Sequence, residues 1–334
     1  MNTQDSVHKI SFDIGVIIPA WNAEASLRRA VESALAQREV SVEVIVVDDA
    51  STDGTLSLAQ EMAAEEPRLR VLDQPLNLGP AAARNRGLAA TQARYVTPLD
   101  SDDFMEPGRL SKLLGVADSG NWDFVADDLY KVRQDRLDGP RQRLWTQNVI
   151  GVQKIDFRTF VRGNLSRLHG GRGELGFIKP LISRTFLEDH ALRYDEEMRL
   201  GEDYALYATA LSFGARFCLT DPAGYVAVTR PDSLSGHHTA KDLGALVTAD
   251  EKLEQLPHLD QAERRALREH SIETRKRWHW MRMIDAVKQR DIIGIIRCFI
   301  APPAVGLSVM GKLFEQLYLR SIGRLFVGRQ NLSE

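Results

Sequence analysis

Residues 95–103 read YVTPLDSDD, a short apolar run that ends in three carboxylates. Val96 and Leu99 are typical of a strand, so the run predicts a buried strand whose carboxyl end opens into a crevice. The three acids repel one another. A divalent cation that prefers oxygen ligands would relieve the repulsion and remain available to phosphate oxygens. A solvated acidic turn is the alternative for this stretch taken alone.

Three strand-and-helix pairs are predicted upstream. Runs of β-branched and aliphatic residues indicate strands at 14–18, 42–47 and 69–72. Apolar residues at helical spacing indicate a helix after each strand, the first capped by Asn22 and the third running from Pro80 to Ala90. This alternation predicts an α/β fold with a doubly wound, mostly parallel sheet, in which ligands bind beyond the carboxyl ends of the strands.

Polar or aromatic side chains follow each strand, where one edge of the sheet would bring them together. They are Trp21, Asn22 and Glu24 after the first strand, Asp49, Ser51 and Asp53 after the second, and Asn77, Arg84 and Asn85 after the third. Each has a local explanation as a cap, a turn or a solvated helix residue. Together with the acidic stretch they indicate a nucleotide diphosphate pocket with a cation site. The first predicted strand is not followed by a Gly-x-Gly-x-x-Gly pattern, and the chain has no Walker-type loop, so neither a dinucleotide site nor a P-loop is supported.

Four segments in chain order carry a resemblance: VIIPAWNAEASLRRAVESALAQ, VEVIVVDDASTDGT, NLGPAAARNRGLAAT and YVTPLDSDD. They resemble the nucleotide-binding half of the family 2 inverting glycosyltransferases, which have the GT-A fold. The resemblance implies a base pocket lined by Pro19, Trp21 and Glu24. It also implies that Asp49 reads the base and that Arg84 approaches the nucleotide. Trp21 stands where the family usually has tyrosine, which keeps the stacking surface but removes the hydroxyl.

The same resemblance assigns the acidic stretch. Asp100 and Asp102 match the outer positions of the Asp-x-Asp motif of the family, with Ser101 between them. Asp102 is the position expected to contact both metal and diphosphate, and Asp100 is a second candidate ligand. The implied cofactor is a divalent cation, Mn²⁺ or Mg²⁺, since both suit carboxylate and phosphate oxygens.

Residues 230–238 (RPDSLSGHH) resemble the closing loop of the family. The resemblance implies that Arg230 folds over the diphosphate of the donor. A neutral imidazole from His237 or His238 could complete the coordination of the metal. A surface histidine is the alternative, because no spacing rule ties either histidine to Asp102.

A second informative stretch is RLGEDYAL at residues 199–206. Asp203 begins an apolar helical run, so a helix cap with a favourable dipole interaction is the simplest explanation of its carboxylate. The chemistry favours a further role. A sugar hydroxyl is a poor nucleophile near neutral pH, and one in-line displacement with inversion needs a base opposite the leaving diphosphate. The resemblance implies that Asp203 is this base, with Glu202 beside it.

The character of the chain changes after residue 240. We expect a GT-A catalytic domain at 1–240, with a nucleotide-binding half at 13–103 and an acceptor half at 104–240, and a helical, basic, amphipathic region at 241–334. From residue 275 onward, eleven Lys or Arg stand against four Asp or Glu. Such a region fits the anionic inner surface of a membrane, with a dimerisation or core-capping element as the alternative. The apolar run 292–310 is a poor transmembrane span, since Arg297 and two prolines interrupt it.

Composition bounds the class of protein. The 334 residues can bury a sizeable core, and a net charge of −3 argues against a dedicated nucleic-acid binder. The two cysteines, Cys218 and Cys298, have no metal-ligand spacing, so reduced thiols in the cytoplasm are expected. The polar amino terminus lacks the apolar core of a signal peptide. We therefore expect a cytoplasmic protein, peripheral on the membrane.

These observations predict an inverting, metal-dependent glycosyltransferase. Its expected donor is a nucleotide diphosphate sugar, UDP-linked, and its expected acceptor is a hydroxyl of a saccharide that is polyprenyl-linked during exopolysaccharide or surface-glycan assembly. One alternative is a sugar-phosphate nucleotidyltransferase, but residues 19–24 lack the glycine-rich basic loop that such an enzyme carries after its first strand. Another is a non-catalytic glycan-binding or nucleotide-sugar-binding module.

Overall fold

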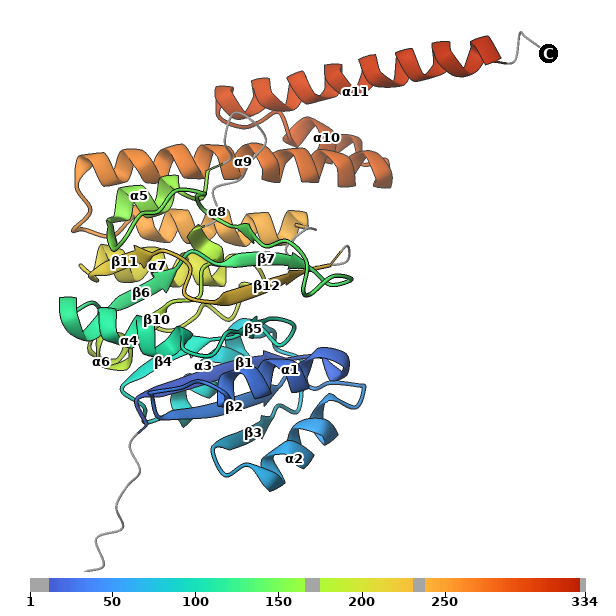
Figure 1. Cartoon of the computed structure of the whole chain (residues 1–334). Helices are drawn as coiled ribbons and strands as arrows, with labels where there is room; N and C mark the ends of the chain where they lie inside the picture. The colour runs from blue at the N-terminus through green and yellow to red at the C-terminus, as the bar shows by residue number, and fades with distance from the viewer. Residues whose placement is uncertain (1–11, 166–174, 231–237, 331–334) are drawn as a thin grey trace, which may run out of the picture. The chain divides into compact units, whose positions relative to one another are not determined.

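The computed structural model describes residues 12–165, 175–230 and 238–330. The chain divides into two compact units, residues 1–236 and 237–334. Figure 1 shows the strands and helices of the first unit, followed by the helices of the second. The first unit holds both sheets.

Four parallel strands form the first half of the main sheet. They are β1 (Ile14–Ala20), β2 (Val42–Asp48), β3 (Leu69–Asp73) and β4 (Tyr95–Pro98), at the four places predicted from the sequence. β1 lies between β2 and β4, with Val16 opposite both Val44 and Thr97. The two central strands are almost continuous apolar runs because helices cover both faces of the sheet.

Alternate residues of these strands face opposite sides of the sheet. On one side, Val16 and Val44 belong to the main core, which also contains Leu27 of α1 (Glu24–Leu35) and Met62 of α2 (Thr55–Glu65). On the other side, residues of β2 pack against α3 (Pro80–Ala90) in a second cluster, formed by Ile45, Val47 and Ala83. The predicted doubly wound arrangement is therefore confirmed.

Four further strands extend the sheet, namely β6 (Phe124–Asp127), β9 (Gln153–Ile155), β10 (Leu181–Ser183) and β11 (Phe217–Thr220). The order of the eight strands is β3-β2-β1-β4-β10-β6-β11-β9. The sheet is mainly parallel, but β10 runs antiparallel to both neighbours and β9 runs antiparallel to β11. Ile182 lies opposite Val96 and Ser183 opposite Tyr95. The chain just before β10 therefore runs beside the residues that follow β4.

A second, four-stranded sheet begins directly after Asp103. Its order is β5-β12-β7-β8, formed by β5 (Phe104–Met105), β12 (Tyr225–Thr229), β7 (Tyr130–Arg133) and β8 (Gln142–Arg143). Two of the four strands are two residues long, which is too short to produce a periodic signal.

The first helix corrects one prediction. α1 begins at Glu24 and no side chain caps it, whereas Asn22 has a φ of 48° and its side-chain oxygen accepts a hydrogen bond from the Thr52 N–H. The predicted Asn22 cap is wrong, because the left-handed residue turns the chain and uses its amide to join the loop after β2. The remaining helices of the first unit are α4 (Arg109–Gly120), α5 (Phe157–Arg162), the 3₁₀ helix η1 (Leu175–Phe177), α6 (Arg184–Asp189) and α7 (Glu202–Ser212).

The second unit is helical. It contains α8 (Ala240–Glu254), α9 (Gln261–Gln289), α10 (Ile292–Arg297) and α11 (Pro303–Gln330), and the other three helices all contact α9. Capping boxes at Thr239 and Asp260 start α8 and α9, so the first part of the predicted helical region 241–334 is divided between two helices. Among the residues described, no helix has both the length and the hydropathy needed to cross a bilayer.

Candidate active site

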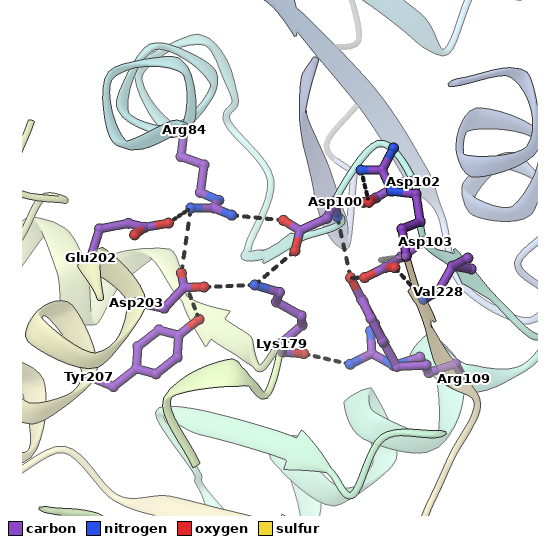
Figure 2. Close-up of polar contacts among 12 residues, drawn as sticks. Arg84, Asp100, Asp102, Asp103, Arg109, Lys179, Glu202, Asp203, Tyr207 and Val228 are labelled. Atoms are coloured by element: carbon purple, nitrogen blue, oxygen red, sulfur yellow. Dashed lines mark hydrogen bonds and ion pairs between the residues drawn. The ribbon is translucent and has the colours of Figure 1, made fainter. Parts of the chain in front are cut away.

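Arg84 of α3 joins acidic residues from two distant parts of the first unit. Its guanidinium lies 2.7 Å from Asp100 Oδ1, 2.5 Å from Glu202 Oε1 and 3.7 Å from Asp203 Oδ1. Asp100 follows β4, while Glu202 and Asp203 are the first two residues of α7. The side chain of Arg84 is only 4% exposed. Figure 2 shows that these groups point toward one another at the carboxyl end of β4.

Lys179 completes this cluster from the opposite side. Its ammonium lies 2.7 Å from Asp203 Oδ2 and 3.1 Å from Asp100 Oδ2, and its side chain is buried. Its backbone carbonyl accepts a hydrogen bond from Arg109, which is itself buried and paired with Asp127. The antiparallel register of β10 beside β4 brings Lys179 to this position. Sequence reasoning missed Lys179, although a lysine within the apolar run FIKPLI is the signal that could have marked it.

Mutual attraction decides the charge state of the cluster. Burial would raise the pKa of Asp100, but Lys179 and Arg84 outweigh it and lower this pKa to about 2. Burial would lower the pKa of Lys179, yet Asp100 and Asp203 raise it above its ordinary value. For Glu202, the effect of burial is larger than that of the contact with Arg84, so the pKa of this carboxyl is raised. The Asp100 carboxylate and the Lys179 ammonium are therefore both ionised at neutral pH.

The acids of the motif divide into two kinds. Asp102 is half-buried, and its carboxylate lies 2.6 Å from the guanidinium of Arg230, so Arg230 does reach the acidic stretch. Asp103 turns away into the second sheet, where its two oxygens accept hydrogen bonds from the Tyr225 hydroxyl and the Val228 N–H. Burial and the neighbouring Asp102 raise the pKa of Asp103 well above its ordinary value. Asp103 therefore anchors the loop to β12, and only Asp100 and Asp102 remain for a ligand.

Asp203 and Glu202 do not act as helix caps. The cap residue of α7 is Gly201, in the left-handed conformation, and no side chain caps this helix. Asp203 Oδ1 instead accepts a hydrogen bond of 3.4 Å from the Tyr207 hydroxyl, one turn along the helix. The carboxylate of Asp203 thus stands in the first turn of α7, where the positive end of the helix dipole favours its negative charge.

Asp49 holds the connection between β3 and α3. Its Oδ1 accepts hydrogen bonds from Gln74 Nε2 and the Leu78 N–H, and its Oδ2 accepts one from the Gly79 N–H. These bonds set the chain that leads into α3 and hence the position of Arg84. A nucleobase that contacts Asp49 would bind carboxylate oxygens that already accept hydrogen bonds from this loop.

Other predicted residues join the loops that follow β1 and β2. Asn22 accepts from Thr52, and Ser51 Oγ accepts from the Asn22 N–H. Glu24 accepts from the Gly54 N–H, while Asp53 accepts from the Glu24 N–H. These reciprocal hydrogen bonds hold the two loops together at the carboxyl end of the sheet, beside Pro19, the penultimate residue of β1. Trp21 is 51% exposed, which leaves its ring as a flat apolar surface at this edge.

Two asparagines, one in α3 and one in the loop that precedes α3, contact the segment before α7. The side chain of Asn85 bonds the backbone of Tyr194 through both its amide nitrogen and its oxygen, and it also contacts Glu196. Asn77 accepts a hydrogen bond from Arg199. These side chains therefore position the chain that carries Glu202 and Asp203. Ser101 lies half-buried in the turn between the two acids.

The fit of a divalent cation depends on Asp100 and Asp102. Within residues 12–165, 175–230 and 238–330, no group of three His, Cys, Asp or Glu side chains is arranged to hold a metal ion. His237 lies outside the described residues. A Mg²⁺-type site needs only one or two carboxylates when diphosphate oxygens and water supply the other ligands. The two acids meet that requirement, so the residues present fit a metal that binds together with a nucleotide diphosphate.

Comparison with known proteins identifies the family. The model described as Glycosyl transferase family 2 matches residues 15–173. Over 311 residues, the chain is 40% identical to the Succinoglycan biosynthesis protein ExoU of Rhizobium meliloti (strain 1021), covering 90% of this chain and 86% of that protein. The chain belongs to glycosyl transferase family 2. The family predicted from the four sequence segments is thereby confirmed.

Solved structures agree on the fold of this family 2 glycosyltransferase. S. aureus TarS in complex with UDP-GlcNAc aligns with a TM-score of 0.63 at 20% identity, over 90% of this chain and 85% of that chain. The mannosyltransferase PcManGT from Pyrobaculum calidifontis, in complex with GDP-Man and Mn²⁺, aligns with a TM-score of 0.56 at 16% identity, over 92% and 81% of the two chains. The predicted GT-A fold is confirmed, and at these identities the likeness extends to the fold alone.

Proposed function

We propose that this family 2 glycosyltransferase moves a sugar from a UDP-sugar to a hydroxyl of a saccharide, with inversion at the anomeric carbon. One observation carries the proposal: the ammonium of Lys179 contacts both Asp100, in the acidic motif, and Asp203, at the start of α7. A diphosphate held at the motif would therefore lie next to a carboxylate supplied by a different element. This is the arrangement that a single in-line displacement requires.

Asp203 is the proposed base. Its carboxylate takes the proton of the acceptor hydroxyl as the hydroxyl oxygen attacks the anomeric carbon. The bond between that carbon and the diphosphate oxygen breaks in the same step, and the electron pair leaves with UDP. Because Lys179 binds Asp203 at 2.7 Å, the acceptor hydroxyl has to compete with this ammonium for the carboxylate. Glu202 acts by holding Arg84, which in turn lies beside both Asp100 and Asp203.

A divalent cation, Mn²⁺ or Mg²⁺, is the proposed cofactor. Asp102 would hold it with the diphosphate, and Asp100 is the second candidate ligand. When bound, the cation would neutralise charge on the leaving diphosphate. Arg230, which pairs with Asp102, would donate instead to the diphosphate oxygens once the cation neutralises that carboxylate. The Mn²⁺ in the complex of PcManGT supports the choice of cofactor.

The nucleotide is proposed to bind over the loops that follow β1 and β2. Trp21 offers its exposed ring for stacking on the base, and Pro19 and Asp49 would line the same pocket. Reciprocal hydrogen bonds hold these two loops together, and they involve Asn22, Glu24, Ser51 and Asp53. The segments next to the proposed diphosphate position contain Asn77, Asn85 and Ser101. The UDP-GlcNAc complex of TarS supports a uridine nucleotide.

The acceptor is proposed to be a lipid-linked saccharide of exopolysaccharide or surface-glycan assembly. The name of ExoU, a succinoglycan biosynthesis protein, supports a role in exopolysaccharide assembly. Residues 13–103 would then bind the donor and residues 104–240 the acceptor, while the helical region 241–334 would hold the enzyme on the cytoplasmic face of the membrane. A homodimer formed through that region is the alternative use of these helices.

A product analysis tests the proposal. The full chain is incubated with Mn²⁺, a panel of UDP-sugars and soluble oligosaccharide acceptors, and the anomeric configuration of any product is read by NMR. Inversion relative to the donor is expected, and retention would contradict a single displacement. A protein that is stabilised by a UDP-sugar but releases no UDP with any acceptor would instead be a nucleotide-sugar-binding module.

A further inference from the structure

The second unit exposes an unusual concentration of large apolar side chains around α10. We call the following set the α10 patch: Val287, Ile292, Ile293, Ile296, Phe299 and Ile300. Ile292 is 70% exposed and Ile300 is 76% exposed, and the other members are at least 38% exposed. A single exposed aliphatic residue is ordinary, but six exposed apolar residues within fourteen positions of the chain indicate an interaction surface.

Local structure explains why these side chains face outward. Asp291 caps α10 by accepting a hydrogen bond from the Gly294 N–H, which fixes the start of the helix. The inward side of the segment packs into a small apolar cluster between the helices of the second unit. In this cluster Cys298 packs with Met283 of α9 and Val309 of α11, and Ile295 lies against them. The isoleucines of the patch cannot join this core without displacing side chains already buried there.

Basic side chains accompany the patch. Lys288, Arg290 and Arg297 are all exposed within the same stretch of chain. The one acid among them, Asp291, has its carboxylate engaged as the helix cap. The segment therefore combines exposed isoleucines with a local excess of positive charge, which is the composition of a surface that meets anionic lipid headgroups.

We propose that α10 and the residues flanking it insert into the headgroup region of an anionic bilayer. The isoleucines would enter the boundary between headgroups and acyl chains, and the three cations would stay at the level of the lipid phosphates. α11 extends the apolar exposure, since Leu307, Phe314 and Tyr318 recur at helical spacing and are each more than 60% exposed. Figure 1 shows α10 directly after the end of α9, and both α10 and α11 contact α9.

Charge favours a bilayer over a second copy of the chain. In a two-fold symmetric contact the α10 patch would meet itself, so Lys288, Arg290 and Arg297 would approach the same cations of the other copy. Anionic headgroups would instead neutralise these side chains. The inference rests on the proposed lipid-linked acceptor, and it names the surface that brings the enzyme to that acceptor.

A vesicle-binding experiment tests the inference with the full chain. Binding is measured by co-sedimentation with vesicles of phosphatidylcholine containing about one-third phosphatidylglycerol, and with vesicles of phosphatidylcholine alone. We expect binding to the anionic vesicles that weakens severalfold when sodium chloride is raised from about 0.1 M to about 0.5 M. The double variant Ile293→Glu/Ile296→Glu should lower the affinity about tenfold or more.

The first unit offers a matched control. Val149 and Val152 are 82% and 54% exposed, so Val149→Glu/Val152→Glu introduces the same charge at two exposed aliphatic positions outside the α10 patch. This variant should bind vesicles like wild type. Donor-induced thermal stabilisation, measured on every variant, should be unchanged and reports that the first unit is folded.

Each other outcome overturns a defined part of the argument. The bilayer proposal is contradicted if wild type does not bind anionic vesicles. It is also contradicted if the Ile293→Glu/Ile296→Glu variant binds them as well as wild type. A wild-type dimer that Ile293→Glu/Ile296→Glu converts to a monomer, with no vesicle binding, assigns the patch to a second copy. Vesicle binding without sugar transfer to any acceptor would support the membrane-binding role of the α10 patch and contradict the proposed function instead.

Discussion

Lys179 and Asp203 form a buried ion pair, with 2.7 Å between Nζ and Oδ2, in which both side chains are less than a tenth exposed. The same ammonium contacts Asp100 at 3.1 Å. One cation thus connects the acidic motif after β4 with the first turn of α7. The pair has two consequences: it keeps two carboxylates close together, and it gives the proposed base a partner that the acceptor hydroxyl must displace.

Asp203→Asn should lower kcat by about 10²- to 10⁴-fold, because the amide cannot take the proton of the acceptor hydroxyl. Donor affinity, measured by thermal shift or calorimetry, should stay near that of wild type. Glu197→Gln makes the same acid-to-amide change at an exposed position shortly before α7 and should leave kcat unaltered. An Asp203→Asn enzyme as fast as wild type would remove Asp203 from the role of base.

Lys179→Met should lower the free energy of unfolding by about 3 kcal/mol, because Asp100 and Asp203 lose one of the two cations that they share. Lys179→Arg keeps the charge and should cost less. Lys112→Met, at an exposed site on α4, should change the free energy of unfolding by no more than about 0.5 kcal/mol. Denaturant unfolding at neutral pH measures all three, and equal stability of the two methionine variants would contradict the importance of the buried pair.

Acid should weaken the contribution of Asp100. Its pKa in the folded protein is about 2, below the ordinary value of 3.8, because Lys179 and Arg84 outweigh the effect of burial. Such a carboxylate stabilises the fold fully above its unfolded pKa, and the stabilisation is lost as the pH falls through the folded pKa. The stability difference between wild type and Asp100→Asn should therefore shrink by about 1–2 kcal/mol as the pH falls from about 5 to about 2, given solvent screening at this half-buried group.

Urea unfolding across this pH range measures the effect. Asp138→Asn changes an exposed carboxylate, so its stability difference from wild type should stay nearly constant with pH. A difference for Asp100→Asn that is equally flat would mean that the contacts with Lys179 and Arg84 do not hold the Asp100 carboxylate in its ionised form.

Removal of divalent cations should weaken donor binding. At a UDP-sugar concentration of about 100 times Kd, binding stabilises the fold by about 2.7 kcal/mol, which corresponds to a rise in Tm of several degrees. We expect a chelator to remove most of this rise, and added Mn²⁺ to restore it in wild type but not in Asp102→Asn. Asp138→Asn serves as the control acid. A donor-induced rise that persists in chelator would reject the metal site at Asp102.

The first half of the main sheet was largely predictable. β1 to β4 and α3 have signals within single stretches of chain: runs of β-branched residues, apolar residues at helical spacing, and Pro80 at the first position of a helix. The family resemblance came from the same local segments. These features arise from interactions between residues close in sequence, so they can be read without knowledge of the tertiary structure.

Asn22 and Asp103 show where such reading fails. The sequence made Asn22 a helix cap, but its conformation and its bond to Thr52 depend on the neighbouring loop after β2. Asp103 looked like a third acid of one cluster, yet it bonds Tyr225 and Val228 of a strand more than a hundred residues away. Local pattern reports which residue types are present, whereas the partner of each polar group depends on which strands lie side by side.

The sequence alone determined the family, the order of the first four strands and of the three helices between them, and the identity of the acids proposed to act at the site. Tertiary structure alone brought Lys179 between Asp100 and Asp203 and buried Arg84 beside them. The physical reason is the antiparallel insertion of β10 next to β4, which makes neighbours of residues that are far apart in the chain. Short-range periodicity carries no information about that pairing, and charge balance at the site depends on it.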